Sequence, residues 1–190
     1  MNADQRDGLI DVADRVAGVA MEVGIPTALI GAMALAVHNY VRGTADIDIA
    51  TSVDPFRELR LLRQRLDAEG FHTELLPPDA NDTLGGLLRV REHNADDRIV
   101  IVNFYNPLKP LGNPGFDAIQ NAAPLAPMQS LRCATLGHLV ALKLFAGGRR
   151  DQADVIELLR RNPATDRGLL RSVCAGYGYG EGLEELIREV

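Results

Sequence analysis

The spacing of apolar residues in the first fifty positions predicts a helix, a strand, a second helix and a second strand. Apolar side chains recur every three or four positions from Asp4 to Val23, which is typical of an amphipathic helix. The run from Ile25 to Ile30 is short and apolar, as in a buried strand, and Gly31 separates it from a helix expected at 32–37. Residues 46–51 then alternate between carboxylates and apolar side chains, the two-residue period of a strand with one polar face.

The rest of the chain predicts another helix, three more strands and a helical C-terminal part. The helix is expected at 56–69, the strands at 71–76, 86–91 and 99–105, and the later helices at 135–145, 151–161, 166–174 and 181–189. Residues 107–127 are rich in Pro, Gly and Asn, which favours irregular chain with at most one short strand. We therefore expect a mixed α/β (α+β) fold with a core at 1–128 and a helical extension at 129–190 packed on it.

Composition narrows the class of protein. A length of 190 residues fits one domain, and a net charge of −6 argues against a broad basic face for non-specific nucleic-acid binding. No apolar run reaches the roughly 20 residues of a membrane span, and the polar, acidic start is unlike a secretory signal, so we expect a cytoplasmic protein without a membrane partner. Cys133 and Cys174 lack the spacing of a zinc site and are interpreted as ordinary thiols.

Asp46 and Asp48 are the first candidates for chemistry. Residues i and i+2 of a strand project to the same face, about 6 to 7 Å apart along the chain. Two carboxylates at that spacing raise one another's pKa unless a cation or an arginine neutralises them, and oxygen ligands of this kind suit Mg²⁺ or Mn²⁺. An Asp-x-Asp pair alone also occurs on solvated strand faces, so its neighbours in the chain decide its meaning.

Gly31 is the neighbour that changes the interpretation. A glycine between a buried strand and a helix lets the backbone approach a ligand, and the start of a helix offers free N–H groups to a phosphate. The same glycine could serve only a tight turn. With the carboxylate pair fifteen residues later, the pattern predicts a phosphate-binding turn beside a metal site, and we expect Asp46 and Asp48 to lie near Gly31.

These motifs together resemble the nucleotidyltransferase superfamily that includes DNA polymerase β. The likeness is carried by Leu29-Ile30-Gly31-Ala32-Met33-Ala34-Leu35-Ala36 and by Arg42-Gly43-Thr44-Ala45-Asp46-Ile47-Asp48. Supporting blocks are the segment 82–89 and the helix pair 139–158, with Lys143-Leu144-Phe145-Ala146 and then Arg149-Arg150-Asp151-Gln152-Ala153-Asp154-Val155. The sequence is most similar to the small bacterial nucleotidyltransferases of the abortive-infection AbiEii toxin type.

The resemblance implies transfer of a nucleoside monophosphate from an NTP to a hydroxyl acceptor. The residues that it assigns to nucleotide binding are Gly31, Ala32, Arg42, Thr44 and Lys143, and those that it assigns to catalysis and to Mg²⁺ or Mn²⁺ are Asp46 and Asp48. On residue type alone, Lys143 fits an exposed helix lysine equally well. For Asp151 and Asp154, helix-start carboxylates that complement the helix dipole are the favoured interpretation.

Two departures from the family pattern bear on activity. Ala32 stands where the family has a second glycine or a serine. Asn103 stands on the strand expected to supply the third carboxylate, the usual candidate base for the acceptor hydroxyl. We expect Asn103 to face the same cleft as the two aspartates and to ligate metal through its carbonyl oxygen only. A different register would bring in Asp96 or Asp97 instead.

Three functional hypotheses follow. The first is an active nucleotidyltransferase whose acceptor is an RNA, a protein or a small molecule, with a toxin role and an antitoxin partner. The second is a binding module of the same fold, impaired by the loss of the third carboxylate at Asn103. The third, disfavoured by the net acidity, takes 136–159 as a DNA-binding helix-turn-helix.

Overall fold

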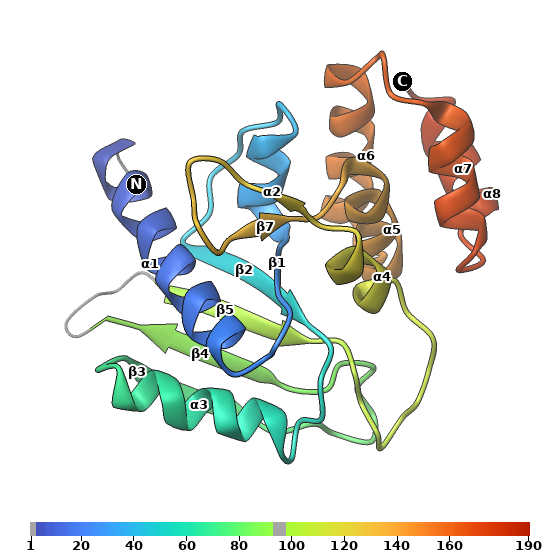
Figure 1. The fold of residues 1–190 in the computed structure, drawn as a ribbon. Coiled ribbons are helices and arrows are strands. Elements are labelled where there is room, and N and C mark those ends of the chain that lie inside the picture. Colours follow the sequence, from blue (N-terminus) through green and yellow to red (C-terminus); the bar gives the residue numbers. More distant parts are fainter. Residues whose placement is uncertain (1–2, 93–97) are drawn as a thin grey trace.

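The computed structural model describes residues 3–92 and 98–190, with side chains from residue 8 onward. These residues form a mixed seven-stranded sheet in the order β3-β4-β5-β2-β1-β7-β6 (Figure 1). The strands are β1 (Ala28–Leu29), β2 (Asp46–Thr51), β3 (His72–Leu76), β4 (Leu87–Arg91), β5 (Arg98–Asn103), β6 (Ala123–Pro124) and β7 (Arg132–Cys133). The helices are α1 (Ala3–Glu22), α2 (Gly31–Val37), α3 (Glu58–Ala68), α4 (Gly115–Gln120), α5 (Leu136–Ala146), α6 (Arg149–Arg161), α7 (Arg167–Ala175) and α8 (Gly180–Ile187).

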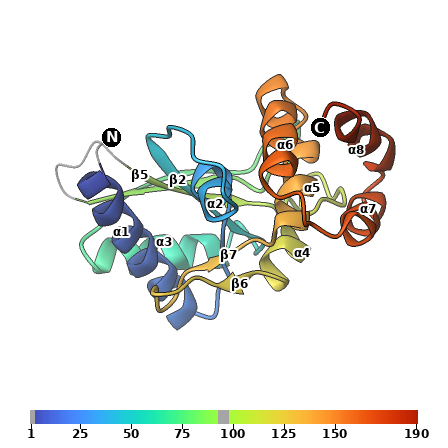
Figure 2. The ribbon, with the colours of Figure 1, turned by 90° about the horizontal axis from the view of Figure 1, so that it is seen from above.

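Helices α1 and α3 lie on the same side of the sheet and bury one of its faces (Figure 2). The apolar stripe of α3, made of Leu59, Leu62 and Leu66, is fully buried against that face. On β5 the side chains of Ile99 and Ile101 point into this core, while Val100 and Val102, which alternate with them, are only partly buried. The two-residue period of the strands therefore leaves the opposite face of β3, β4 and β5 more open to solvent.

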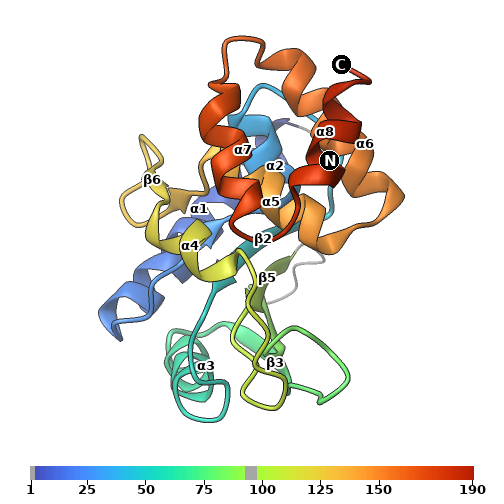
Figure 3. The same cartoon turned by 90° about the vertical axis from the view of Figure 1, so that its right-hand side faces the viewer.

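The C-terminal helices gather at one end of the sheet, away from α3 (Figure 3). Helix α6 buries Val155, Leu158 and Leu159, and these residues belong to the same core cluster as the sheet and α1. Strand β7, a little beyond the expected boundary at 128, pairs with β1. The sheet therefore continues into the segment that leads to the helices.

Strand register fixes which side chains lie beside one another. Strands β2 and β5 are parallel, with Asp46 opposite Arg98 and Asp48 opposite Val100. Strand β1 is antiparallel to β2, and β3 and β4 continue the sheet antiparallel beyond β5. Strand β2 thus lies between β1, which leads into Gly31, and β5.

The segment 107–127 is more regular than its composition predicts. It contains helix α4 and strand β6. A Cβ added to Gly115 would stand 2.1 Å from the ring of Phe104, so the first turn of α4 is packed directly on that aromatic side chain. Tertiary packing rather than local propensity forms this helix, and sequence periodicity over so short a segment carries little signal.

Two simpler expectations can be compared with the structure. Within 3–92 and 98–190 no helix is long and apolar enough to cross a membrane. Cys133 and Cys174 are both buried free thiols, and burial raises the pKa of Cys133 to about 12 and that of Cys174 to about 11. Neither thiol is activated as a nucleophile.

Candidate functional site

Asp46 and Asp48 share one face of β2, as the alternating pattern predicted. Both are partly buried, whereas Ile47 and Ile49 between and after them are fully buried on the other face. The strand therefore delivers two carboxylates side by side to the face of the sheet that α1 and α3 leave uncovered.

The turn at Gly31 brings the backbone against Asp48. Gly31 has φ +62, and a Cβ placed on it would stand 2.0 Å from Oδ2 of Asp48. The backbone N–H of Ile30, just before it, donates a hydrogen bond of 2.9 Å to the backbone oxygen of Asp48. Only glycine fits this turn, because any side chain would be strained and would collide with the carboxylate. Ala32, by contrast, turns its side chain into the buried interior.

The carboxylate of Asp48 has no hydrogen bond or ion pair with any residue of 3–92 or 98–190. Its pKa is raised to about 6, chiefly by burial and also by the charge of Asp46, while Lys143 and Arg42 act in the opposite direction. A partly buried carboxylate without a partner is unfavourable in its charged form. The site is therefore suited to a cation that binds directly to Asp48.

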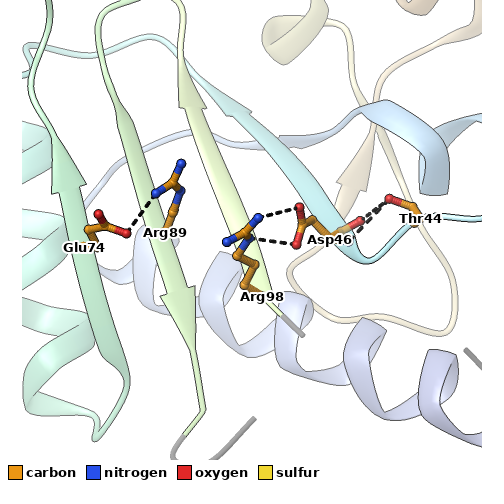
Figure 4. Close-up of polar contacts among 5 residues, drawn as sticks. All are labelled: Thr44, Asp46, Glu74, Arg89 and Arg98. Atoms are coloured by element: carbon orange, nitrogen blue, oxygen red, sulfur yellow. Dashed lines mark hydrogen bonds and ion pairs between the residues drawn. The ribbon is translucent and has the colours of Figure 1, made fainter. Parts of the chain in front are cut away.

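Asp46 has a different environment because an arginine holds its carboxylate. Nε of Arg98 donates to Oδ1 of Asp46 at 2.9 Å and Nη2 donates to Oδ2 at 3.4 Å (Figure 4). The hydroxyl of Thr44 donates to the backbone oxygen of Asp46 at 2.9 Å. Thr44 therefore fixes the start of β2 and does not touch the carboxylate.

Arg42 and Lys143 meet at one buried carboxylate, that of Asp154. Nε of Arg42 lies 3.2 Å from Oδ1 of Asp154, and Nζ of Lys143 lies 2.9 Å from Oδ2. Lys143 also donates to Asp151 at 2.7 Å. Asp154 is 1% exposed and Lys143 9% exposed. The interpretations of Asp154 as a helix-dipole carboxylate and of Lys143 as an exposed lysine are therefore wrong, because a buried charge needs a paired partner.

Asn103 lies where we did not expect it. It pairs with Thr51 in the parallel ladder, so it projects to the face of Ile47 and Ile49 and away from Asp48. Its side chain is fully buried. The amide nitrogen donates to the backbone oxygens of Val53 and Gly85 at 2.9 and 3.1 Å, and its oxygen accepts from the N–H of Val53 at 3.0 Å. Asn103 is bound to backbone groups, and its placement in the cleft as a metal ligand is a wrong prediction.

The positions beside the two aspartates are filled by other residues. On the face of β5 that Asp46 and Asp48 share, the side chains are those of Arg98, Val100 and Val102. Among the described residues no group of three or more His, Cys, Asp or Glu side chains could hold a metal ion. Asp96 and Asp97, the alternative source of a third carboxylate, lie outside the described residues.

A cavity of about 330 Å³ opens beside Gly31. The sheet side contributes Gly31, Leu84, Val102 and Phe104, and α5 contributes Leu142 and Lys143. Its walls are largely apolar, but Lys143 also lines it, and Gly31 lies against the carboxylate of Asp48. The arrangement offers an apolar space next to a cation and a carboxylate pair, the usual composition of a small-molecule site.

No family model and no curated protein matches the chain. Solved structures do match over almost its whole length. The solution structure of the antibiotic-resistance factor ANT(2'')-Ia is 14% identical with a TM-score of 0.59, and covers 99% of both chains. The crystal structure of the same factor with adenylyl-2''-tobramycin is 13% identical with a TM-score of 0.53, covering 88% of this chain and 95% of the other.

A third solved structure is similar to the same degree. The antigenic nucleotidyltransferase-like protein of Paracoccidioides brasiliensis is 15% identical with a TM-score of 0.53, and the match covers 96% of this chain and 93% of that one. At these identities the likeness concerns the fold. The chain therefore has a nucleotidyltransferase-like fold.

Proposed function

We propose that this protein is a metal-dependent nucleotidyltransferase that moves a nucleoside monophosphate from an NTP to a hydroxyl acceptor. The observation that carries the proposal is the unpartnered carboxylate of Asp48, pressed against the Gly31 turn with Arg42 and Lys143 as the cations that lower its pKa. A partly buried carboxylate that lacks a partner fits a divalent cation, and the neighbouring cations fit phosphates.

The roles of the residues follow from their places. Asp46 and Asp48 would hold Mg²⁺ or Mn²⁺, which neutralises the charge of the transferring phosphoryl group when bound. The triphosphate would lie against the Gly31 backbone and near Lys143, since no side chain caps the start of α2. The apolar cavity beside Gly31 would take the nucleoside. With two protein carboxylates, the remaining metal ligands would come from phosphate and water.

In the transfer, the acceptor oxygen bonds to the α-phosphorus as its proton leaves, and pyrophosphate departs with the electrons of the broken P–O bond. Arg42 and Lys143 are positioned by Asp154 to offset that negative charge. Catalysis of this kind depends on positioning and on charge neutralisation, which this site supplies without a nucleophilic side chain.

Val100 and Val102 favour a second candidate function. They occupy the face of β5 next to Asp46 and Asp48, where the resemblance places the third carboxylate. Without that base an enzyme would turn over slowly, so an NTP-binding module is the alternative. The AbiEii likeness and a toxin role with an antitoxin partner rest on the sequence motifs alone. A cytoplasmic location rests on the polar N-terminal sequence. All of these belong to the proposal.

Calorimetry with an NTP in the presence of Mg²⁺ tests the proposal. Asp48→Asn preserves the shape of the side chain and is expected to weaken Mg²⁺-dependent NTP binding at least about tenfold, because charge-assisted contacts exceed about 1.4 kcal/mol. Asp11→Asn is the matched control, since Asp11 is exposed on α1. Equal NTP affinity in Asp48→Asn and Asp11→Asn would reject the site.

A further inference from the structure

The face of the sheet opposite α1 and α3 continues from the two aspartates across β5, β4 and β3. Its rows follow the strand register: Glu74 is opposite Arg89, Arg89 opposite Val100, and Val100 opposite Asp48. Every residue of this face on β4 and β5 is partly or fully exposed, whereas Leu88, Val90, Ile99 and Ile101 on the other face are buried.

Three arginines lie on this face of the sheet. Arg89, Arg91 and Arg98 line one open groove of about 450 Å³, together with His72 and Glu74. Arg98 is bound to Asp46 and Arg89 donates to Glu74 at 3.0 Å (Figure 4). Arg91 is exposed and has no ion pair with a carboxylate of 3–92 or 98–190. We call Arg89, Arg91 and Arg98 the arginine platform.

The arginine platform lies on the far side of the carboxylates from the phosphate turn. Gly31 follows β1, the arginines stand on β4 and β5, and β2 with Asp46 and Asp48 runs between β1 and β5. An in-line displacement needs the leaving group and the attacking oxygen on opposite sides of the phosphorus. With the NTP at Gly31, this geometry would bring the acceptor oxygen from the side of the arginines.

We propose that the arginine platform binds consecutive phosphates of the acceptor, which is the end of a single nucleic-acid strand. This inference rests on the proposed function and names its acceptor class. Arg89 and Arg91 are two residues apart on one strand, so their side chains emerge about 6.6 Å from each other. Two cations at that separation match neighbouring phosphates of a strand better than one isolated phosphate, and guanidinium groups bind phosphate oxygens in pairs.

The charge of this surface favours an anionic acceptor over a polycationic one. Arg89 and Arg98 are each paired with a carboxylate, but Arg91 has no ion pair within residues 3–92 and 98–190, so it adds a positive charge that would repel a polycation. A packing role is a poor explanation for the arginines, because exposed ion pairs such as Arg89–Glu74 add about 0–1 kcal/mol and adjacent like charges cost stability.

Fluorescence anisotropy with a labelled single-stranded oligoribonucleotide, without metal or NTP, tests the proposal. Arg89→Gln and Arg91→Gln should each weaken binding about fivefold near 0.1 M salt and reduce the salt slope by about 0.7, as expected for one lost phosphate contact on a single strand. Arg60→Gln removes the same charge from the exposed surface of α3, on the covered side of the sheet, and should leave the affinity unchanged. Circular dichroism melting checks that all three variants fold.

Two results would overturn the proposal. One is an equal loss of RNA affinity in Arg60→Gln and Arg91→Gln, which would indicate non-specific attraction. The other is a nucleoside monophosphate or tobramycin that competes as well as the oligonucleotide does. The Asp48→Asn calorimetry is independent of this titration. An unchanged NTP affinity there, with RNA binding that depends on Arg91, would refute the proposed function and leave the strand-binding surface standing.

Discussion

The carboxylate of Asp48 lies so close to Gly31 that a Cβ on the glycine would stand 2.0 Å from Oδ2. Two segments that are distant along the chain, the turn after β1 and the middle of β2, thus meet without an intervening side chain. The contact sets the distance between the backbone that would face phosphate and the carboxylate that would hold the metal.

Gly31→Ala should separate backbone strain from this contact. Both Gly31 and Gly24 have positive φ, but nothing lies within 4 Å of a Cβ on Gly24. Each alanine variant should lose about 1–3 kcal/mol of unfolding free energy through strain. Gly31→Ala alone should also lose about 10²-fold in nucleotidyl transfer, because Asp48 is displaced. Chemical denaturation and a labelled-NTP transfer assay measure the two effects, and equal transfer rates in the two variants would contradict the contact's role.

Asp48→Asn should make the metal-free protein more stable at neutral pH. The pKa of Asp48 is raised from 3.8 to about 6, chiefly by burial, so the folded state binds its proton more tightly than the unfolded state does. Stability attributable to this group therefore falls as pH rises from about 4 to about 6 and stays lowered above that range. The stability gain of Asp48→Asn should be full at pH 7 and absent below pH 4. Urea titrations with a chelator measure it, and a gain independent of pH would be inconsistent with the raised pKa.

Asp154→Ala should be among the most destabilising substitutions near the site. It leaves the buried Lys143 and the partly buried Arg42 without their shared partner, and removal of one member of a buried pair costs about 3–5 kcal/mol. Glu157→Ala on the same helix removes a surface partner of Arg160 and should cost at most about 1 kcal/mol. Guanidinium denaturation of both variants tests the difference. Equal, small losses of unfolding free energy in the two variants would show that water solvates Arg42 and Lys143.

Val100→Asp should complete a three-carboxylate site. Val100 is opposite Asp48 in the parallel ladder and is only partly buried, so a carboxylate there shares the face of the two aspartates. We expect tighter Mg²⁺ binding and a gain of about 10² to 10⁴ in transfer rate, the range typical of general-base catalysis. Calorimetry and the labelled-NTP assay measure these quantities. If the wild type is active and Val100→Asp lowers its transfer rate, the site works with two carboxylates.

Asn103→Asp should have the opposite effect, although Asn103 stands on the same strand. Its amide donates to the backbone oxygens of Val53 and Gly85, and a carboxylate would replace those donors by a buried charge against carbonyl groups. The cost should be at least about 1–3 kcal/mol, without a gain in metal affinity. A melting curve that matches the wild type would contradict the backbone-bound role of Asn103.

The strand of the two aspartates was predictable to the residue because its faces differ in chemistry. Asp46 and Asp48 alternate with buried isoleucines, so the two-residue period assigned each side chain to a face. On β5 every residue from Ile99 to Val102 is apolar, and the sequence contains no such signal there. A shift of one residue inverts the faces of a strand, which is why Asn103 was assigned to the cleft.

The arginine platform carried a signal that the sequence analysis did not use. Arg89 and Arg91 alternate with Leu88 and Val90, which places both arginines on one face of a predicted strand. However, β4, β5 and β2 become neighbours in the sheet through pairing between distant segments. No local sequence pattern predicts that strand order. The exposed arginines of α3, such as Arg60, lie on the other side of the sheet.

The shared carboxylate of Asp154 limits how far this fold can be divided into separate parts. It comes from α6, whereas Arg42 precedes β2 and Lys143 belongs to α5. A shortened protein that ended before residue 149 would retain Asp46 and Asp48 yet release both cations that accompany them. The segment with the two aspartates could therefore not be transferred alone to another protein. A different helical part would have to place an acidic side chain where Asp154 lies, so that Arg42 and Lys143 are again neutralised.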